Sequence, residues 1–157
     1  MDVEKFSWRM IELMPQIARE ISRYENNYLT RGKITLPQFW LLEYLSRQGE
    51  SKMSHVAQTL GISKPATTGL IARLIAQKLV GRRDDQDDRR VVWIALTAKG
   101  KNIIQNIRRQ KHRTLVKMFG GVSAQDRARH LQMFEQMVKN LDASVKSKQA
   151  GARLKTE

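Results

Sequence analysis

The residues with the clearest chemistry lie in segment 82–90, RRDDQDDRR, which holds four arginines and four aspartates. Guanidinium groups bind carboxylates and phosphates through planar pairs of hydrogen bonds. The chain has a formal net charge of +14, so four acids in one short segment are unexpected. We interpret them as struts that fix arginine side chains through bidentate bonds. Composition alone also fits a solvated, charge-balanced hairpin.

The charge of the whole chain predicts a polyanionic partner. With 29 Lys+Arg against 15 Asp+Glu and a pI near 10.5, the surface attracts nucleic acid or an anionic membrane, and charge alone does not choose between them. Residues 1–30 hold four basic and five acidic side chains, whereas residues 101–157 hold thirteen and four. The first segment is therefore not the expected contact with the polyanion.

Several classes of protein are disfavoured by composition. The longest apolar run, residues 91–96, is far shorter than the roughly 20 residues that span a membrane. The first residues lack the apolar core of a secretory signal and the chain has no cysteine, so we expect a cytoplasmic protein without disulfides. The three histidines are isolated and no phosphate-binding glycine loop is present, so we expect no catalytic residue, no cofactor and no metal site.

The apolar spacing predicts helices at both ends of the chain. From Val3, apolar residues recur every three or four positions to Tyr28, which indicates a long amphipathic helix. Pro15 leaves two alternatives: a kink near Met14, or a main helix that begins there. Near the other end, Ser123 with Asp126 is typical of the start of a final helix with an apolar stripe at 131, 134, 138 and 141.

Between them, capping residues predict a helix-turn-helix followed by a hairpin. Thr35 caps a helix that stops at Gly49, Ser54 caps a short helix that ends at Gly61, and Ser63 caps a longer one that runs to about residue 78. Segments 79–83 and 90–96 are rich in β-branched and aromatic residues and predict two strands, with the acidic tip between them. Thr97 then caps a helix over 98–119.

This order predicts a mainly α (α+β) fold, a winged helix-turn-helix with N- and C-terminal helices that form a dimerisation region. The expected boundaries are 1–34 for the N-terminal dimerisation helix, 35–97 for the DNA-binding domain, 98–145 for the C-terminal dimerisation helices and 146–157 for a flexible basic tail. A winged core is too small to cover both terminal stripes, so we expect a homodimer, with packing within one chain as the alternative.

One face of the helix that begins at residue 64 is expected to contact DNA. At 100° per residue, Leu70, Ile71 and Leu74 share the core side, together with Thr67 and the stem of Lys78. Small residues point the other way, as a major-groove helix requires, and basic residues flank them. The candidate DNA contacts on this helix and the hairpin are Ser63, Lys64, Pro65, Thr67, Thr68, Gly69, Arg73, Arg82, Arg89 and Arg90.

Four motifs carry a family resemblance: Leu60-Gly61-Ile62-Ser63, Leu74 with Leu79-Val80, Arg82-Arg83-x-Asp85-x-x-Asp88-Arg89-Arg90 and Leu96-Thr97-x-x-Gly100. The chain resembles the MarR (multiple-antibiotic-resistance regulator) family over about residues 36–100. The resemblance implies an obligate dimer that places one helix in the major groove and the wing in the minor groove of a pseudopalindromic operator in double-stranded DNA.

The resemblance also implies roles for single residues. Asp85 and Asp88 brace the wing, and Arg90 or its neighbour Arg89 enters the minor groove. Gly69 departs from the larger polar residue often found there, which puts base readout by that position in doubt.

Many members of the family release DNA when a small, often aromatic anion binds between the terminal helices and the winged core. The candidate pocket residues are Tyr24, Tyr28, Trp40, Tyr44, Arg47 and His55, although an aromatic stripe is more often plain core. We therefore expect a ligand-controlled transcriptional regulator, a repressor. A nonspecific architectural nucleic-acid-binding protein is the alternative.

Overall fold

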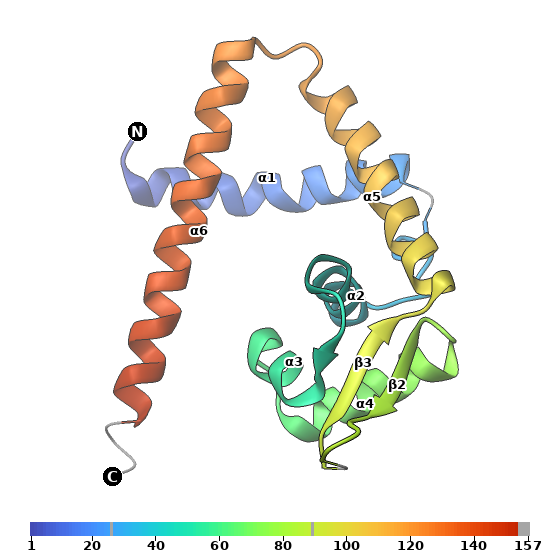
Figure 1. Ribbon diagram of the computed structural model, residues 1–157. Coiled ribbons are helices and arrows are strands. Elements are labelled where there is room, and N and C mark those ends of the chain that lie inside the picture. Colours follow the sequence, from blue (N-terminus) through green and yellow to red (C-terminus); the bar gives the residue numbers. More distant parts are fainter. Residues whose placement is uncertain (26, 89, 154–157) are drawn as a thin grey trace. The chain divides into compact units, whose positions relative to one another are not determined.

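The computed structural model describes residues 1–25, 27–88 and 90–153, and the side chains of these up to residue 143. Clustering of contacts divides the chain into two compact units, Met1–Thr114 and Leu115–Glu157. The described elements follow one another in the order α1 (Val3–Tyr24), α2 (Leu36–Gln48), β1 (Ser51–Lys52), α3 (Met53–Leu60), α4 (Lys64–Ala76), β2 (Val80–Asp84), β3 (Val92–Leu96), α5 (Ala98–Phe119) and α6 (Ala124–Arg153) (Figure 1). The predicted winged helix-turn-helix, mainly α with a small antiparallel sheet, is confirmed.

Local capping explains where most helices begin. Thr35 and Gln38 form a reciprocal capping box at α2, and the Ser63 hydroxyl accepts the Ala66 N–H at the start of α4. Thr97 Oγ1 accepts the Gly100 N–H at 3.1 Å at the start of α5. In each cap, a side-chain oxygen accepts the backbone N–H three residues later. Such short-range pairs are visible in the sequence, which is why the sequence alone located them.

Three expectations about helix ends need correction. Ser54 does not cap α3, because β1 leads the chain directly into that helix and Lys52 occupies the cap position without a side-chain bond. Lys78 does not extend the core side of α4: the helix ends at Ala76, and Lys78 is an exposed residue with φ of 58°. The last helix, α6, continues to Arg153, eight residues past the expected end of the helical region, through a segment rich in the helix formers Ala, Lys and Gln.

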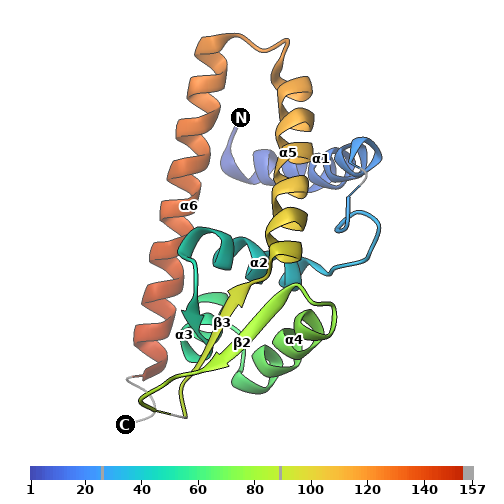
Figure 2. The same cartoon turned by 45° about the vertical axis from the view of Figure 1, so that its right-hand side comes forward.

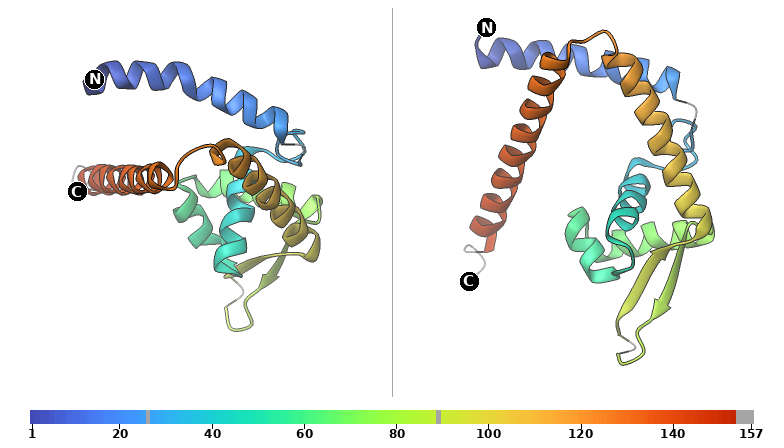
Figure 3. Two further views of the ribbon diagram at one scale, coloured as in Figure 1. Left: turned by 90° about the horizontal axis from the view of Figure 1, so that it is seen from above. Right: turned by 45° about the horizontal axis from the view of Figure 1, so that its top comes forward.

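Helix α1 continues through Pro15 without a break in its assigned helix, so the alternative of a start near residue 14 is wrong. Asp2 caps its beginning by accepting the Lys5 N–H at 2.8 Å. Proline removes one i→i−4 hydrogen bond from the helix interior. Figure 3 shows that α1 curves along its length.

The sheet has the strand order β1-β3-β2, and both pairs are antiparallel. Strands β2 and β3 form the predicted hairpin, with Val80 opposite Leu96 and Asp84 opposite Val92. Strand β1 was not predicted, since two residues carry no periodic pattern. The hairpin projects beyond the helices that pack on it, and α4 lies alongside β2 (Figures 2 and 3).

The core of the first unit lies where the three central helices, the sheet and the first half of α5 meet. Its fully buried members come from each of these elements: Leu41, Leu42, Leu45, Val56, Leu74, Leu79, Val80, Ile94, Ile104 and Ile107. Gly100 permits the closest approach, because a Cβ on this residue would lie 2.1 Å from the Leu79 carbonyl oxygen. A glycine is therefore required where α5 crosses the start of β2.

The two terminal helices keep their apolar stripes uncovered. No residue of α1 is buried. On α6 the predicted stripe of Leu131, Phe134, Val138 and Leu141 is between 50% and 65% exposed. Contiguous apolar surface of this kind on a soluble protein usually marks an interaction site.

Candidate nucleic-acid interface

The exposed side of α4 carries small and basic residues, as expected. Lys64, Thr68 and Arg73 are exposed, and Gly69 between them is half-buried. The Thr68 hydroxyl donates to the Lys64 carbonyl at 3.0 Å, and Arg73 Nε donates to the Gly69 carbonyl at 3.2 Å. A Cβ at Gly69 would have 4.0 Å to its nearest neighbour, so the protein itself does not require glycine there.

The prediction that Thr67 contacts DNA needs correction. Its side chain is 0% exposed and its hydroxyl donates to the Ser63 carbonyl at 3.0 Å. A side chain that is buried in the core and bonded to its own helix cannot reach a base or a phosphate. Ser63 and Pro65 are exposed at the start of α4 and remain candidates.

The acidic residues of the wing brace its backbone, which corrects the expected partners. Asp85 Oδ1 accepts the N–H groups of Asp87 and Asp88 at 3.0 and 3.2 Å, and its Oδ2 accepts Trp93 Nε1–H at 2.6 Å. Asp88 Oδ1 accepts the Arg90 N–H at 2.9 Å. These bonds, from the indole first and then from the two amides, hold the pKa of the Asp85 carboxyl below its ordinary value.

The bidentate arginine–carboxylate pair of the wing involves a glutamate that lies outside the acidic tip. Arg83 donates through Nε and Nη2 to the two carboxylate oxygens of Glu50, both at 2.7 Å. This pair lowers the pKa of the Glu50 carboxyl and raises that of the Arg83 guanidinium. Arg82 pairs with Asp84 at 3.0 Å. No local pattern pointed to Glu50, because it lies 33 residues from its partner.

Arg90 lies at the tip of the wing with its side chain exposed. Its backbone is fixed by Asp88, and the chain closes around it through Val91 N–H to the Asp88 carbonyl at 2.8 Å. Arg89 lies outside the described residues. The tip therefore presents Arg90 on a turn whose amides are held by two carboxylates.

A groove of about 290 Å³ runs between the N-terminal parts of α3 and α4 and the wing. Its polar and charged lining comes from Lys52, Ser54, Lys64, Thr67, Thr68 and Arg90, and no carboxylate belongs to the lining described. Lys52 and Ser54 were not among the predicted contacts. Their place in the groove depends on β1, which the sequence pattern did not reveal.

The predicted pocket residues are distributed over separate environments. Tyr24 and Trp40 are 60% and 51% exposed. Tyr44 packs edge-on against His55 with ring centroids 6.4 Å apart, and Arg47 pairs with Glu43 at 3.0 Å. Of these predicted pocket residues, Tyr44 and His55 contact each other, whereas Tyr24 and Trp40 lie largely exposed.

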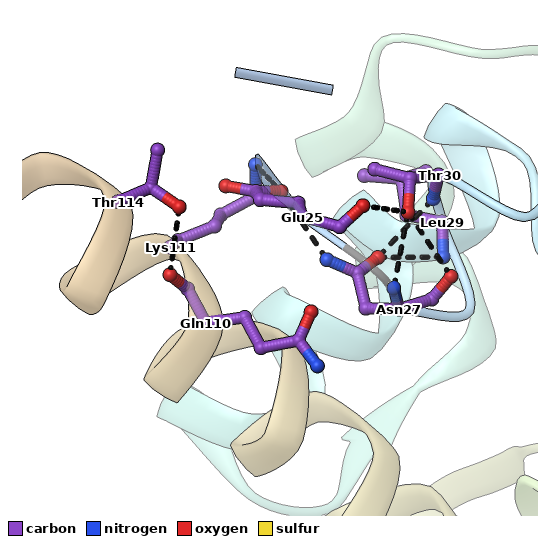
Figure 4. A network of polar contacts seen from close by, with 7 residues as sticks. All are labelled: Glu25, Asn27, Leu29, Thr30, Gln110, Lys111 and Thr114. Atoms are coloured by element: carbon purple, nitrogen blue, oxygen red, sulfur yellow. Dashed lines mark hydrogen bonds and ion pairs between the residues drawn. The ribbon is translucent and has the colours of Figure 1, made fainter. Parts of the chain in front are cut away.

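Tyr28 lies instead beside a polar network at the connection from α1 to α2. Figure 4 shows Glu25, whose side chain is 2% exposed, next to Asn27 and Lys111. Asn27 Nδ2 donates to Glu25 Oε2 at 3.2 Å, and Lys111 Nζ lies 3.4 Å from the same oxygen. The pocket that adjoins this network measures about 260 Å³, and its lining residues are Asn27, Tyr28, Arg31, Lys33, Asn106 and Gln110.

Two other kinds of site are absent from the described part of the chain. No helix there is both long and apolar enough to cross a membrane. Over the same residues, no three His, Cys, Asp or Glu side chains come together as metal ligands would. The basic groove and the exposed face of α4 are the features that the fold positions for a ligand.

A helix with a small-residue face, a wing with a fixed arginine and a basic groove between them define a winged helix-turn-helix protein of the DNA-binding class. A sequence model of the MarR family matches residues 33–91. The HTH-type transcriptional regulator YsmB of Bacillus subtilis (strain 168) is 31% identical over 147 residues, which cover 94% of this chain and 93% of YsmB. The chain belongs to the MarR family of transcriptional regulators.

Solved structures share the fold. A MarR-like transcriptional regulator from Thermotoga maritima superposes with a TM-score of 0.72 at 24% identity, covering 90% of this chain and 98% of that one. BpsR of Bordetella bronchiseptica gives a TM-score of 0.60 at 24% identity, with 83% and 98% covered. The likeness extends well beyond residues 33–91, so the terminal helices are part of the shared architecture.

Proposed function

We propose that the chain acts as a homodimer that binds a pseudopalindromic operator in cytoplasmic DNA and represses transcription until a small ligand releases it. The observation that carries this proposal is the common orientation of α4 and the wing. Lys64 and Thr68 of α4 and Arg90 of the wing line the two sides of one basic groove. A protein that reads two adjacent grooves of a duplex needs this arrangement.

In this proposal α4 enters the major groove. Thr68 and Lys64 lie near its N-terminus, where hydroxyl and ammonium groups reach base edges and phosphates. Gly69 lets the helix backbone approach the duplex closely, and Arg73 contacts a phosphate on its flank. Because Gly69 has room for a Cβ in the free protein, the reason for glycine at this position lies with the bound DNA.

The wing places Arg90 in the neighbouring minor groove, and Arg89 beside it in the chain is a second candidate. An arginine side chain is attracted into a narrow minor groove by its strongly negative potential. Asp85 and Asp88 fix the backbone from which Arg90 extends, so little ordering remains to be done on binding. Arg82 lies farther along β2, where its pair with Asp84 directs it toward the strand.

The uncovered stripes of α1 and α6 support the homodimer. A second copy provides the same two stripes, so a twofold axis buries all four at once. The twofold axis then presents two α4 helices to the two half-sites of an inverted repeat. Packing of the two stripes against each other within one chain is the alternative, and it would need no second copy.

Control by a small anion is supported by the pocket that Tyr28 lines. Arg31 and Lys33 give this pocket two positive charges, while the Asn27 amide is bonded to Glu25 and Gln110 donates to Asn106 Oδ1 at 3.2 Å. BpsR, which shares the fold, is regulated in its DNA binding by 6-hydroxynicotinic acid, an aromatic carboxylate. We place the effector of this chain in the same chemical class.

Selection of bound duplexes from a random pool tests the function. A sequence-specific dimer enriches an inverted repeat and binds it at least about a thousandfold more tightly than random duplex at physiological salt. Equal binding of the enriched and random duplexes would instead support a nonspecific architectural protein. Deletion of residues 144–157 is the matched control, because a specific regulator keeps its site preference without this basic segment.

A further inference from the structure

Lys52, Trp93 and Arg83 form one row across the sheet. Lys52 on β1 and Arg83 on β2 both lie opposite Trp93 on β3 in the strand register. Side chains of directly opposed residues share a face of the sheet. Lys52 Nζ and Arg83 Cζ each lie 5.4 Å from the centre of the Trp93 ring, within the range of a cation–π interaction.

Of the two cations in this row, Arg83 is paired with a carboxylate and Lys52 is not. Arg83 is neutralised by its bidentate pair with Glu50. Lys52 is exposed, and no carboxylate among the described residues lies within salt-bridge distance of it, although, after the bonds from the Trp93 indole and the wing amides, its charge also favours the ionised form of the Asp85 carboxyl and so lowers the pKa of that group. Lys52 therefore contributes net positive charge to the groove that it lines with Ser54.

The position of this groove identifies the ligand. One of its walls carries Lys64 and Thr68, which face the major groove in the proposed function, and the other carries Arg90, which enters the minor groove. In a duplex, these two grooves are separated by a sugar-phosphate strand. The strand must therefore pass between the two walls, over Lys52 and Ser54.

We propose that Lys52, assisted by the Ser54 hydroxyl, binds a backbone phosphate of this strand, and that Trp93 is the positioning residue for this contact and for the wing. The proposal rests on the proposed mode of DNA binding. The ring of Trp93 supports the Lys52 ammonium. Its N–H holds Asp85, which in turn holds the amides of Asp87 and Asp88. One side chain thus sets the distance between the phosphate contact and the tip.

The phosphate contact is tested by Lys52→Met, which keeps an unbranched side chain and removes the charge. Affinity for the selected operator and for a random duplex is measured over a series of salt concentrations. The negative slope of log affinity against log salt concentration should become less steep by about 0.9, the value for one phosphate, on both duplexes. Lys52→Arg should restore the slope, and Lys101→Met, which removes an equal charge from the exposed side of α5, should leave it unchanged.

A slope for Lys52→Met equal to that of Lys101→Met overturns the phosphate contact. This outcome is distinct from failure of the proposed function, in which the wild-type chain itself would not distinguish the operator from the random duplex. The random duplex still reports on Lys52 in that case, because phosphate contacts do not depend on base sequence.

The role of Trp93 is tested by two substitutions that separate its ring from its N–H group. Trp93→Phe keeps an aromatic face for Lys52 and loses the bond to Asp85, so the salt slope should persist while operator affinity falls about tenfold. Trp93→Leu should lose both the slope of one phosphate and the affinity. Thermal unfolding confirms that each variant is folded. Wild-type slopes and affinities in both variants would show that Trp93 only fills space.

Discussion

Glu43 on α2 and Arg108 on α5 form a bidentate ion pair across the first unit. Arg108 Nη2 donates to Oε1 at 2.8 Å and Nε donates to Oε2 at 3.0 Å. Glu43 is 19% exposed and Arg108 is 40% exposed. The pair joins the first helix of the winged core to the helix that follows the wing, and neither residue is among the described lining of the basic groove.

Glu43→Gln should lower the free energy of unfolding by about 1 kcal/mol without changing the selected DNA sequence. The loss is modest because solvent screens Arg108. Chemical denaturation measures it. Glu20→Gln, which breaks an exposed pair with Arg23 on α1, is the control and should be neutral. Equal losses of unfolding free energy in both variants would show that the α2–α5 pair stabilises the protein no more than an exposed surface pair does.

The same pair predicts a dependence of stability on pH. Its hydrogen bonds from Arg108 hold the pKa of the Glu43 carboxyl below its ordinary value in the folded chain. A depressed carboxyl pKa contributes stability above the unfolded value, and this contribution is lost as pH falls through the folded value. The difference in unfolding free energy between the wild type and Glu43→Gln should be constant near neutrality and shrink below about pH 4.5.

Two glycine substitutions should have opposite effects on folding. Gly100→Ala forces a Cβ against the Leu79 carbonyl, so it should destabilise the protein by about 3 kcal/mol or more. Gly69→Ala meets no clash and should stabilise α4 by about 0.5–1 kcal/mol. Thermal unfolding and operator binding are measured together. If Gly69→Ala also leaves operator affinity intact, no close approach of DNA occurs at that position.

Arg90→Ala should weaken operator binding at least tenfold and leave the fold unchanged, because its exposed side chain makes the proposed minor-groove contact. Asp88→Ala should weaken it less, since the residue acts only by holding the Arg90 amide. Fluorescence anisotropy with labelled operator measures both. Wild-type affinity in Arg90→Ala would exclude the wing tip from DNA recognition.

The α6 stripe should control assembly. Phe134→Glu places a charge in the proposed interface and should convert a dimer at micromolar concentration into a monomer. Gln136→Glu introduces the same charge change off the stripe and should remain dimeric. Sedimentation velocity distinguishes the two states. A monomeric wild type would refute the proposed symmetry and, with it, the need for an inverted repeat.

Local features were predictable from the sequence, and pairings between distant residues were not. The Thr35, Ser63 and Thr97 caps and the hairpin depend on neighbours a few positions away, so composition and spacing identified them. The partners of Arg83 and Arg108 come from distant parts of the sequence, and no periodic pattern predicts such pairs.

The aspartates of the wing have partners of two kinds. Asp84 pairs with Arg82, as an arginine brace would, whereas Asp85 and Asp88 accept from backbone amides and an indole. Asp85 meets Trp93 only because the hairpin register brings strand β3 back beside the tip. Thr67 was placed both in the core and on the DNA face. Its complete burial decides for the core.

Strand β1 is so short that it supports β3 only at Trp93 and Ile94, which leaves the pair of Asp84 and Val92 without a third strand. Two-stranded ribbons twist more freely than wider sheets. Beyond Trp93 the hairpin therefore has no third strand to hold its twist. In the proposed mode of binding, such a ribbon can adjust its tip to minor grooves of unequal width, so we expect changes in the A·T content at the edge of an operator to produce graded losses of affinity instead of abrupt ones.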